Sequence, residues 1–159
     1  ESEKNKGSIF YFSIPFTNKL EKDSDSKGGI TSNNNASKLK KLTVLIAEDD
    51  ETSEMLLEIT MDEIAKKVFV AKTGVETVKI CRDNPDIDLV LMDIQMPEMD
   101  GYQATKQIRQ FNKDVIIIAQ TAFALSGDKE KAINMGCNAY ISKPVDKSAL
   151  KALLKKHFR

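Results

Sequence analysis

The feature that most constrains this chain is a regular alternation of short apolar segments with longer amphipathic ones after residue 41. The apolar segments predict five strands: Leu42–Ala47, Val68–Ala71, Leu89–Met92, Val115–Ala119 and Ala139–Ile141. The amphipathic segments predict five helices: 52–64, 74–84, 101–111, 127–136 and 146–157. Strands that alternate with helices over short connections form a parallel sheet with helices on both faces. We therefore expect an α/β fold of five βα units, a doubly wound sheet with strand order 2-1-3-4-5.

The chain before Leu42 has a different character. From Phe10 to Phe16, large apolar residues recur at every second position, which is typical of one face of a strand. A lone strand cannot bury such a face, so residues 1–16 are interpreted as the end of a larger domain. Residues 17–41 are rich in Lys, Ser, Asn, Asp and Gly, and they predict a flexible linker because they cannot bury enough apolar surface to become ordered.

Composition narrows the class of protein. The 24 basic and 24 acidic residues balance, so the charge gives no reason to expect nucleic acid as a direct partner. Cys81 and Cys137 have no metal-binding spacing and are expected to be reduced core thiols in a cytoplasmic protein. No apolar run approaches the roughly 20 residues that cross a bilayer, so we expect no membrane contact within this chain; any membrane anchor would belong to a longer parent protein.

Polar residues follow the ends of four predicted strands. The run Leu89–Met92 is expected to be buried on both faces, and it stops at Asp93. Glu48 and Asp49 follow the first strand, Thr121 the fourth and Lys143 the fifth. Ligands bind at the carboxyl ends of strands in open α/β sheets, so these side chains are expected to converge on one edge.

Three carboxylates so close together need positive charge. Two like charges about 4 Å apart repel by roughly 4 kcal/mol at an effective dielectric constant of 20, and Lys143 offsets only part of this for Glu48, Asp49 and Asp93. A hard divalent cation, Mg²⁺ or Mn²⁺, would supply the rest. Asp50, the next residue, is instead expected to be a solvated loop residue.

Residues 42–159 resemble a two-component response regulator receiver domain, which has the flavodoxin-like fold. The resemblance rests on the segments Ala47–Asp50, Met92–Gly101, Thr121–Ala122 and Ile141–Pro144. It implies that Asp93 is the phosphoacceptor and that Lys143 is the site lysine. It also implies metal binding by Glu48, Asp49, Asp93 and the backbone carbonyl of Gln95. One departure is Glu48, because this position is often Asp in the family.

The resemblance also implies how the phosphoryl group is received and read. A phosphohistidine on a kinase dimerisation domain or on a histidine phosphotransfer protein would be the donor. Ala122 and Phe123 would border the phosphoryl site, and the Lys143–Pro144 peptide is expected to be cis. Thr121 and Tyr140 would act as switch residues that reshape the face formed by segments 127–136, 139–141 and 146–157. A homodimer through that face is a further expectation.

The segment Gly7–Pro15 resembles the last strand of a sensor histidine kinase ATP-binding domain. This implies that residues 1–16 are the C-terminal remnant of such a domain and that the parent is a hybrid sensor histidine kinase. The sequence itself holds no kinase catalytic core, so whether it counts as an enzyme stays open.

Three alternatives are weighed against the receiver. An aspartyl-phosphate phosphatase of similar fold places its nucleophile in an Asp-x-Asp pattern after the first strand, which Glu48-Asp49-Asp50 lacks. A flavin binder needs a Ser/Thr/Gly-rich loop there. An interaction module that works without phosphorylation would not need Asp49, Asp93, Thr121 and Lys143 together.

Overall fold

The computed structural model describes residues 2–3, 7–8, 41–122 and 127–158. The chain divides into two units, Glu1–Ala36 and Ser37–Arg159. In the first unit, β1 (Ser2–Glu3) pairs in antiparallel fashion with β2 (Gly7–Ser8). The strand predicted over residues 10–16 and the predicted linker up to residue 40 lie outside the described residues.

Five parallel strands form the sheet of the second unit, in the order β4-β3-β5-β6-β7. Their bounds are β3 Leu42–Ala47, β4 Ala65–Ala71, β5 Leu89–Asp93, β6 Ile116–Thr121 and β7 Ala139–Ser142. Counted within this unit alone, the order is 2-1-3-4-5, so the predicted flavodoxin-like fold is confirmed.

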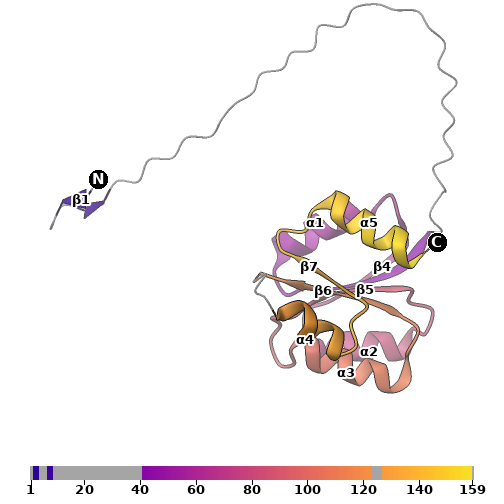
Figure 1. Cartoon of the computed structure of the whole chain (residues 1–159). Coiled ribbons are helices and arrows are strands. Elements are labelled where there is room, and N and C mark those ends of the chain that lie inside the picture. Colours follow the sequence, from indigo (N-terminus) through magenta and orange to yellow (C-terminus); the bar gives the residue numbers. More distant parts are fainter. Residues whose placement is uncertain (1, 4–6, 9–40, 123–126, 159) are drawn as a thin grey trace, which may run out of the picture. The chain divides into compact units, whose positions relative to one another are not determined.

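Helices cover both faces of this sheet, with α1 and α5 on one face and α2, α3 and α4 on the other (Figure 1). Their bounds are α1 Glu51–Met61, α2 Gly74–Asp83, α3 Gly101–Phe111, α4 Asp128–Asn134 and α5 Lys147–His157. Four of them begin behind a side chain that accepts a hydrogen bond from the first turn: Asp50, Thr73, Asp100 and Asp146. None of the helices described has the length and apolarity to cross a membrane.

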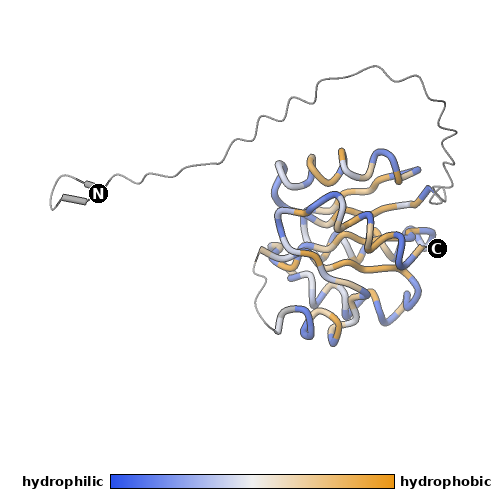
Figure 2. Tube along the Cα trace, turned by 45° about the horizontal axis from the view of Figure 1, so that its top comes forward, coloured by the Kyte–Doolittle hydropathy of each residue, from blue (hydrophilic) through white to orange (hydrophobic). Residues whose placement is uncertain are grey.

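The core lies on both sides of the sheet because alternate residues of each strand enter different clusters. In β3, Leu45 and Ala47 pack with the cluster under α2 and α3, whereas Val44 and Ile46 pack with the cluster under α1 and α5. Figure 2 shows mostly apolar residues along the central strands and more polar residues along the helices around them. A fully buried aliphatic side chain contributes about 1.5–3 kcal/mol, so these two clusters hold the strand ends in place.

Both cysteines lie in the core as free, buried thiols, as predicted. Burial raises the pKa of the Cys81 thiol to about 12, which keeps this side chain protonated and unreactive at neutral pH.

The predicted boundary between the first helix and the second strand was wrong. Helix α1 ends at Met61 rather than at residue 64, and β4 begins at Ala65 rather than at Val68. Ile64 forms a buried turn here: its N–H donates to the carbonyl of Met61 at 2.8 Å, and its own carbonyl accepts from the N–H of Leu42 at 3.0 Å. Strand β4 lies at the edge of the sheet, and its second and third residues, Lys66 and Lys67, are exposed. For this reason the apolar pattern did not reveal where the strand starts.

Candidate functional site

Polar side chains gather where the central strands of the second unit end. Glu48 and Asp49 follow β3, Asp93 is the last residue of β5, and Lys143 follows β7. The parallel register places the ends of β3 and β5 side by side. The prediction that these four side chains meet is confirmed by their contacts and by the clustering of their carboxylates.

Lys143 joins the two buried acids. Its Nζ donates hydrogen bonds to Oδ2 of Asp93 and to Oε1 of Glu48, each at 2.7 Å. The other oxygen of Asp93 accepts a hydrogen bond from the backbone N–H of Gln95 at 3.0 Å. The Lys143–Pro144 peptide is cis, as expected. The Asp93 carboxylate is therefore held from two sides, by β7 and by the loop that follows its own strand.

The site carries more negative charge than Lys143 neutralises. One carboxylate oxygen from each of Glu48, Asp49 and Asp93 lies within 4.8 Å of the others. The Glu48 side chain is fully buried, and burial raises its pKa although the hydrogen bond from Lys143 opposes the shift. Burial disfavours the charged form of Lys143, but the hydrogen bonds to Asp93 and Glu48 outweigh it and raise the pKa of this lysine.

The donor set fits a hard divalent cation. Oε2 of Glu48 is buried and has no hydrogen-bond partner among the described residues, although Nζ of Lys143 lies 2.7 Å from it. Carboxylate oxygens are the ligands that Mg²⁺ prefers in proteins, usually with water and phosphate oxygens completing the shell. A cation here would also reduce the repulsion among the three carboxylates.

The loop from β5 to α3 is fixed by close backbone approaches. A Cβ on Gly101 would lie only 2.1 Å from the carbonyl oxygen of Asp93, so this position requires glycine. Glu98 has a φ of 64°, a left-handed conformation that is uncommon for a residue with a side chain. The Asp100 side chain then caps α3. The backbone that surrounds Asp93 is therefore held rigidly.

The residues predicted to sense phosphorylation lie next to this cluster. Thr121 ends β6 with a buried side chain, and its carbonyl accepts a hydrogen bond from the N–H of Lys143 at 2.7 Å. Tyr140 is half-buried on β7 and packs against the core cluster under α2 and α3. Ala122 is exposed directly after β6, whereas Phe123 lies outside the described residues.

Sequence reasoning missed Lys72, which follows β4. Its ammonium forms an ion pair with Glu54 of α1 and lies 3.4 Å from the backbone carbonyl of Asp49. The hydrogen bond to Glu54 raises the pKa of Lys72. The signal that could have identified it is the one used for the other strands, a polar residue directly after a strand end.

Helix α1 presents an apolar surface next to the site that the sequence analysis also missed. Met55, Leu56 and Ile59 are 63%, 47% and 64% exposed. Leu56 lines a small cavity together with Glu48, which places this surface beside the acidic cluster. The signal was present in the sequence, since these residues do not share the helix face that Leu57 and Met61 bury. Asp50 caps α1 and remains exposed, as expected.

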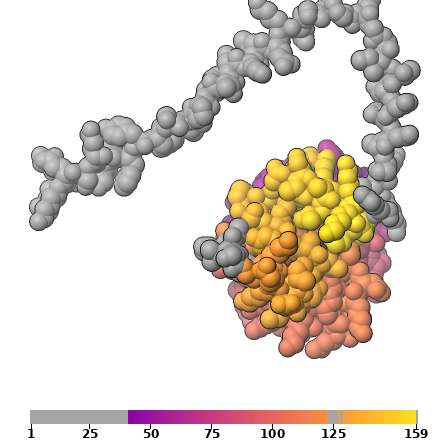
Figure 3. All heavy atoms as spheres, viewed as in Figure 1, coloured from indigo at the N-terminus to yellow at the C-terminus, as the bar shows by residue number. Residues whose placement is uncertain are grey.

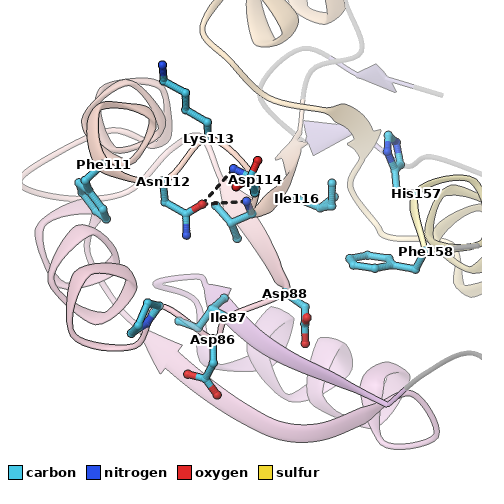
Figure 4. Close-up of a pocket in the computed structure, with 12 residues that line it drawn as sticks. Asp86, Ile87, Asp88, Phe111, Asn112, Lys113, Asp114, Ile116, His157 and Phe158 are labelled. Atoms are coloured by element: carbon cyan, nitrogen blue, oxygen red, sulfur yellow. Dashed lines mark hydrogen bonds between the residues drawn. The ribbon is translucent and has the colours of Figure 1, made fainter.

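A larger hollow, of about 530 Å³, lies at the opposite end of the sheet (Figure 4). The loops before β5 and β6 and the end of α5 line it, with Asp86, Asp88, Asp114 and His157 among the polar residues. Among the described residues, only Glu48, Asp49 and Asp93 bring three metal-binding side chains together. His157, the single histidine of the chain, lines this hollow and not the acidic cluster.

The family model and the individual relatives that match this chain indicate the same protein family. Residues 44–155 match the family model of the response regulator receiver domain. The polar-differentiation response regulator DivK of Brucella ovis is 36% identical over 105 residues, which cover 65% of this chain and 85% of DivK.

Solved structures agree. The structure of the Saccharomyces cerevisiae receiver domain of Ssk1 with the histidine phosphotransfer protein Ypd1 matches with 34% identity and a TM-score of 0.70, over 76% of this chain and 90% of the other. The receiver domain of the sensor histidine kinase PA1611 from Pseudomonas aeruginosa, solved with magnesium in its active-site cleft, matches with 30% identity and a TM-score of 0.66, over 74% and 98%. This chain therefore belongs to the response regulator receiver domains, and its second unit is a receiver domain of a two-component phosphorelay.

Proposed function

We propose that Asp93 is the residue that accepts the phosphoryl group, and that its donor is a phosphohistidine. The observation that carries this proposal is the position of the Asp93 carboxylate. It is held by Lys143 at 2.7 Å and by the N–H of Gln95 at 3.0 Å, within 4.8 Å of the carboxylates of Glu48 and Asp49. Among the described residues, no other group of three metal-binding side chains lies this close together.

The transfer is a substitution at phosphorus. A carboxylate oxygen of Asp93 forms the new O–P bond while the P–N bond to the donor imidazole breaks, and the electron pair of that bond stays on the imidazole nitrogen. The ammonium of Lys143 is positioned to bind a phosphoryl oxygen and to neutralise its charge. Thr121 supplies a hydroxyl for another phosphoryl oxygen, and the small side chain of Ala122 leaves space beside it.

We assign metal binding to Glu48, Asp49, Asp93 and the backbone carbonyl of Gln95. The buried carboxylate oxygens and the excess of negative charge support this assignment. A bound Mg²⁺ would neutralise charge on the phosphoryl oxygens during transfer. The protein contributes the fixed orientation of the ligands, through Lys143 and the rigid loop after Asp93.

The exposed apolar face of α1 is the proposed docking surface for the donor. Met55, Leu56 and Ile59 form it, and Leu56 reaches the cavity that Glu48 also lines. Exposed apolar patches beside a reactive centre mark protein interaction sites. A helical phosphohistidine protein that covered this face would bring its imidazole to the acidic cluster.

The proposed output surface is the face formed by α4, β7 and α5. Figure 3 shows the C-terminal part of the chain, from α4 to α5, gathered on one side of the second unit. Ile133 and Met135 are 45% and 38% exposed there. A phosphoryl group on Asp93 would accept a hydrogen bond from the Thr121 hydroxyl, draw that side chain inward and let Tyr140 turn into the vacated space. That movement would change the surface offered to a partner or to a second copy.

The test uses acetyl phosphate as a small phosphoryl donor and intact mass as the readout. The wild-type chain is expected to gain one phosphoryl group with Mg²⁺ present and none with a chelator. Asp93→Asn is expected to gain none in either condition, and the adduct should be removed by hydroxylamine, which cleaves acyl phosphates. An adduct that persists in Asp93→Asn, or no adduct in the wild type, would overturn the proposal.

We also infer that the sequence comes from a hybrid sensor histidine kinase. The kinase-like segment Gly7–Pro15 and the similarity to the PA1611 receiver domain support this origin. The coding sequence upstream of Glu1 should then encode the glycine-rich ATP-binding motifs of such kinases. An upstream sequence without them would contradict the inference.

A further inference from the structure

Gln120 is a polar residue without a partner inside the core. It lies in β6, its side chain is fully buried, and neither its Oε1 nor its Nε2 has a hydrogen-bond partner among the described residues. Buried amides are almost always hydrogen-bonded, since a bare amide loses its hydration on folding and gains nothing in return. The side chain of Gln120 therefore requires a hydrogen-bond partner that the described residues do not supply.

Gln120 and Glu48 both line the small cavity beside the acidic cluster. Its volume is about 60 Å³, and Ser53 and Lys143 also line it. Among the described residues, Oε2 of Glu48 is the other buried polar atom near the site without a hydrogen-bond partner, although it lies 2.7 Å from Nζ of Lys143. A space of roughly 10–15 Å³ holds one water when two or more polar groups surround it, so this cavity is large enough.

We propose that Gln120 is a positioning residue for Glu48 and acts through water held in this cavity. The amide N–H of Gln120 donates to the water oxygen, and the water donates to Oε2 of Glu48. Register supports the placement, because Gln120 of β6 pairs with Asp93 of β5, so it lies beside a residue of the acidic cluster.

A water-mediated contact to residue 48 is useful because this residue is glutamate. Glutamate has one more rotatable bond than the aspartate often found at this position, so its carboxylate needs more restraint to present a fixed oxygen to a metal. Lys143 donates a hydrogen bond to Oε1 of Glu48 and its Nζ also lies 2.7 Å from Oε2, so the water held by Gln120 would add a directional hydrogen bond to Oε2. The consequence for Mg²⁺ rests on the proposed function, whereas the contact itself does not.

The first experiment tests the contact alone. In the wild-type chain without metal, the side-chain amide protons of Gln120 are expected to show nuclear Overhauser contacts to a long-lived water. Gln120→Met keeps the unbranched shape and removes the polar atoms, with Gln120→Leu as a second variant. If the amide of Gln120 has no partner, replacing it by an apolar side chain removes a buried unsatisfied group and should raise the melting temperature. If a water bridges the amide to Glu48, the apolar variants should show no such rise. No water contact together with a higher melting temperature would overturn the proposal.

The second experiment tests the consequence for the metal by titration calorimetry with Mg²⁺. Gln120→Met is expected to weaken binding about tenfold, as loss of groups that orient metal ligands commonly does. The same substitution in a Glu48→Gln background should have no further effect, because Gln120 acts through Glu48. Ile118→Val, a packing change two residues away in the same strand, is the matched control and should leave binding unchanged.

The outcomes separate the inference from the proposed function. Equal weakening by Gln120→Met in both backgrounds would contradict an action through Glu48. A wild-type chain that shows the water contact but binds no Mg²⁺ would contradict the proposed metal site and leave the contact between Gln120 and Glu48 standing.

Discussion

The two ends of the same sheet use polar side chains in opposite ways. At the amino ends of the strands, side-chain oxygens accept hydrogen bonds from backbone amides: Asp88 from Thr43 at 2.8 Å and Asn138 from Ile117 at 2.8 Å. At the carboxyl ends, acids face one another across a single ammonium. Side chains that accept hydrogen bonds from backbone N–H groups stabilise the fold, whereas acids that repel one another are available to bind a ligand.

The volume of a cavity at either end of the sheet does not indicate where the reactive side chains lie. The hollow at the amino ends, about 530 Å³, is far larger than the 60 Å³ cavity beside the acidic cluster. Two side chains that line the larger one accept hydrogen bonds from backbone N–H groups: Asp88 from Thr43, and Asn112 from Asp114 and Val115 (Figure 4). The contrast predicts that equivalent substitutions at the two ends have different effects.

The largest effect is expected from Lys143→Met. Removing an oriented charge that stabilises a transition state commonly lowers the rate by about 100–1,000-fold, so phosphorylation by acetyl phosphate should slow to that extent. Intact mass against time measures it. Lys113→Met makes the same chemical change at the amino ends and should leave the rate unchanged. Equal rates for the wild type and Lys143→Met would remove the functional distinction between the two ends.

The next effect tests where the donor binds. Ile59→Glu places a charge on the exposed apolar face of α1, and loss of one central interface contact of about 1.4 kcal/mol or more slows transfer about tenfold or more. Transfer from a phosphorylated histidine phosphotransfer protein measures this. Phosphorylation by acetyl phosphate should not change, because that donor needs no docking surface.

Phe111→Glu is the matched control for this experiment, because Phe111 is an exposed apolar residue, 41% accessible, at the amino ends. Slowing by Phe111→Glu to the same degree as Ile59→Glu would place the docking surface elsewhere.

A smaller effect is expected at the amino ends, on stability rather than chemistry. The side chain of Asn138 accepts hydrogen bonds from the N–H of Ile117 and from Arg109, at 2.8 and 2.7 Å. Asn138→Ala leaves both donors without this partner, which should lower the free energy of unfolding by about 1–3 kcal/mol. Urea unfolding measures it, with the exposed Asn134→Ala as control. Unchanged stability would show that such contacts do not hold this end together.

The sequence predicts the carboxyl-end cluster well because parallel strands must end at one edge. Asp93 and Lys143 lie far apart in the chain, yet each follows an apolar run, and that is enough to bring them together. The start of β4 could not be predicted in this way, since its first residue, Ala65, is followed by two exposed lysines and the strand conformation there depends on pairing with β3.

Two further residues have surroundings that the sequence pattern alone does not predict. Lys72 follows a strand, but its contact with Glu54 depends on how α1 packs beside β4. Gln120 is visible as a polar residue in an apolar run, but its lack of a partner depends on the cavity around it. A sequence pattern gives the face of an element, whereas contacts between elements require the three-dimensional packing.

The smallest predicted effect is on the free energy of unfolding in the absence of metal, and it arises from Glu48 at the carboxyl ends of the strands. Burial raises the pKa of Glu48, so the folded state binds this proton more tightly than the unfolded state does. The contribution of Glu48 to stability is therefore fully present below its unfolded pKa and is lost as the pH rises through the higher folded pKa. Each unit of difference corresponds to about 1.4 kcal/mol.

Glu48→Gln should consequently unfold less readily than the wild type at pH 7 in a chelator, and its stability should vary less between pH 4 and 8. Urea unfolding at several pH values measures both. Glu63→Gln is the control, because Glu63 is an exposed acid whose pKa is lowered by its hydrogen bond with Lys151, so its pH dependence has the opposite sign. A Glu48→Gln variant that is less stable than the wild type at pH 7 would mean that Lys143 stabilises this carboxylate by more than burial destabilises it. In that case the carboxyl ends would resemble the amino ends, with each polar group paired for the sake of the fold.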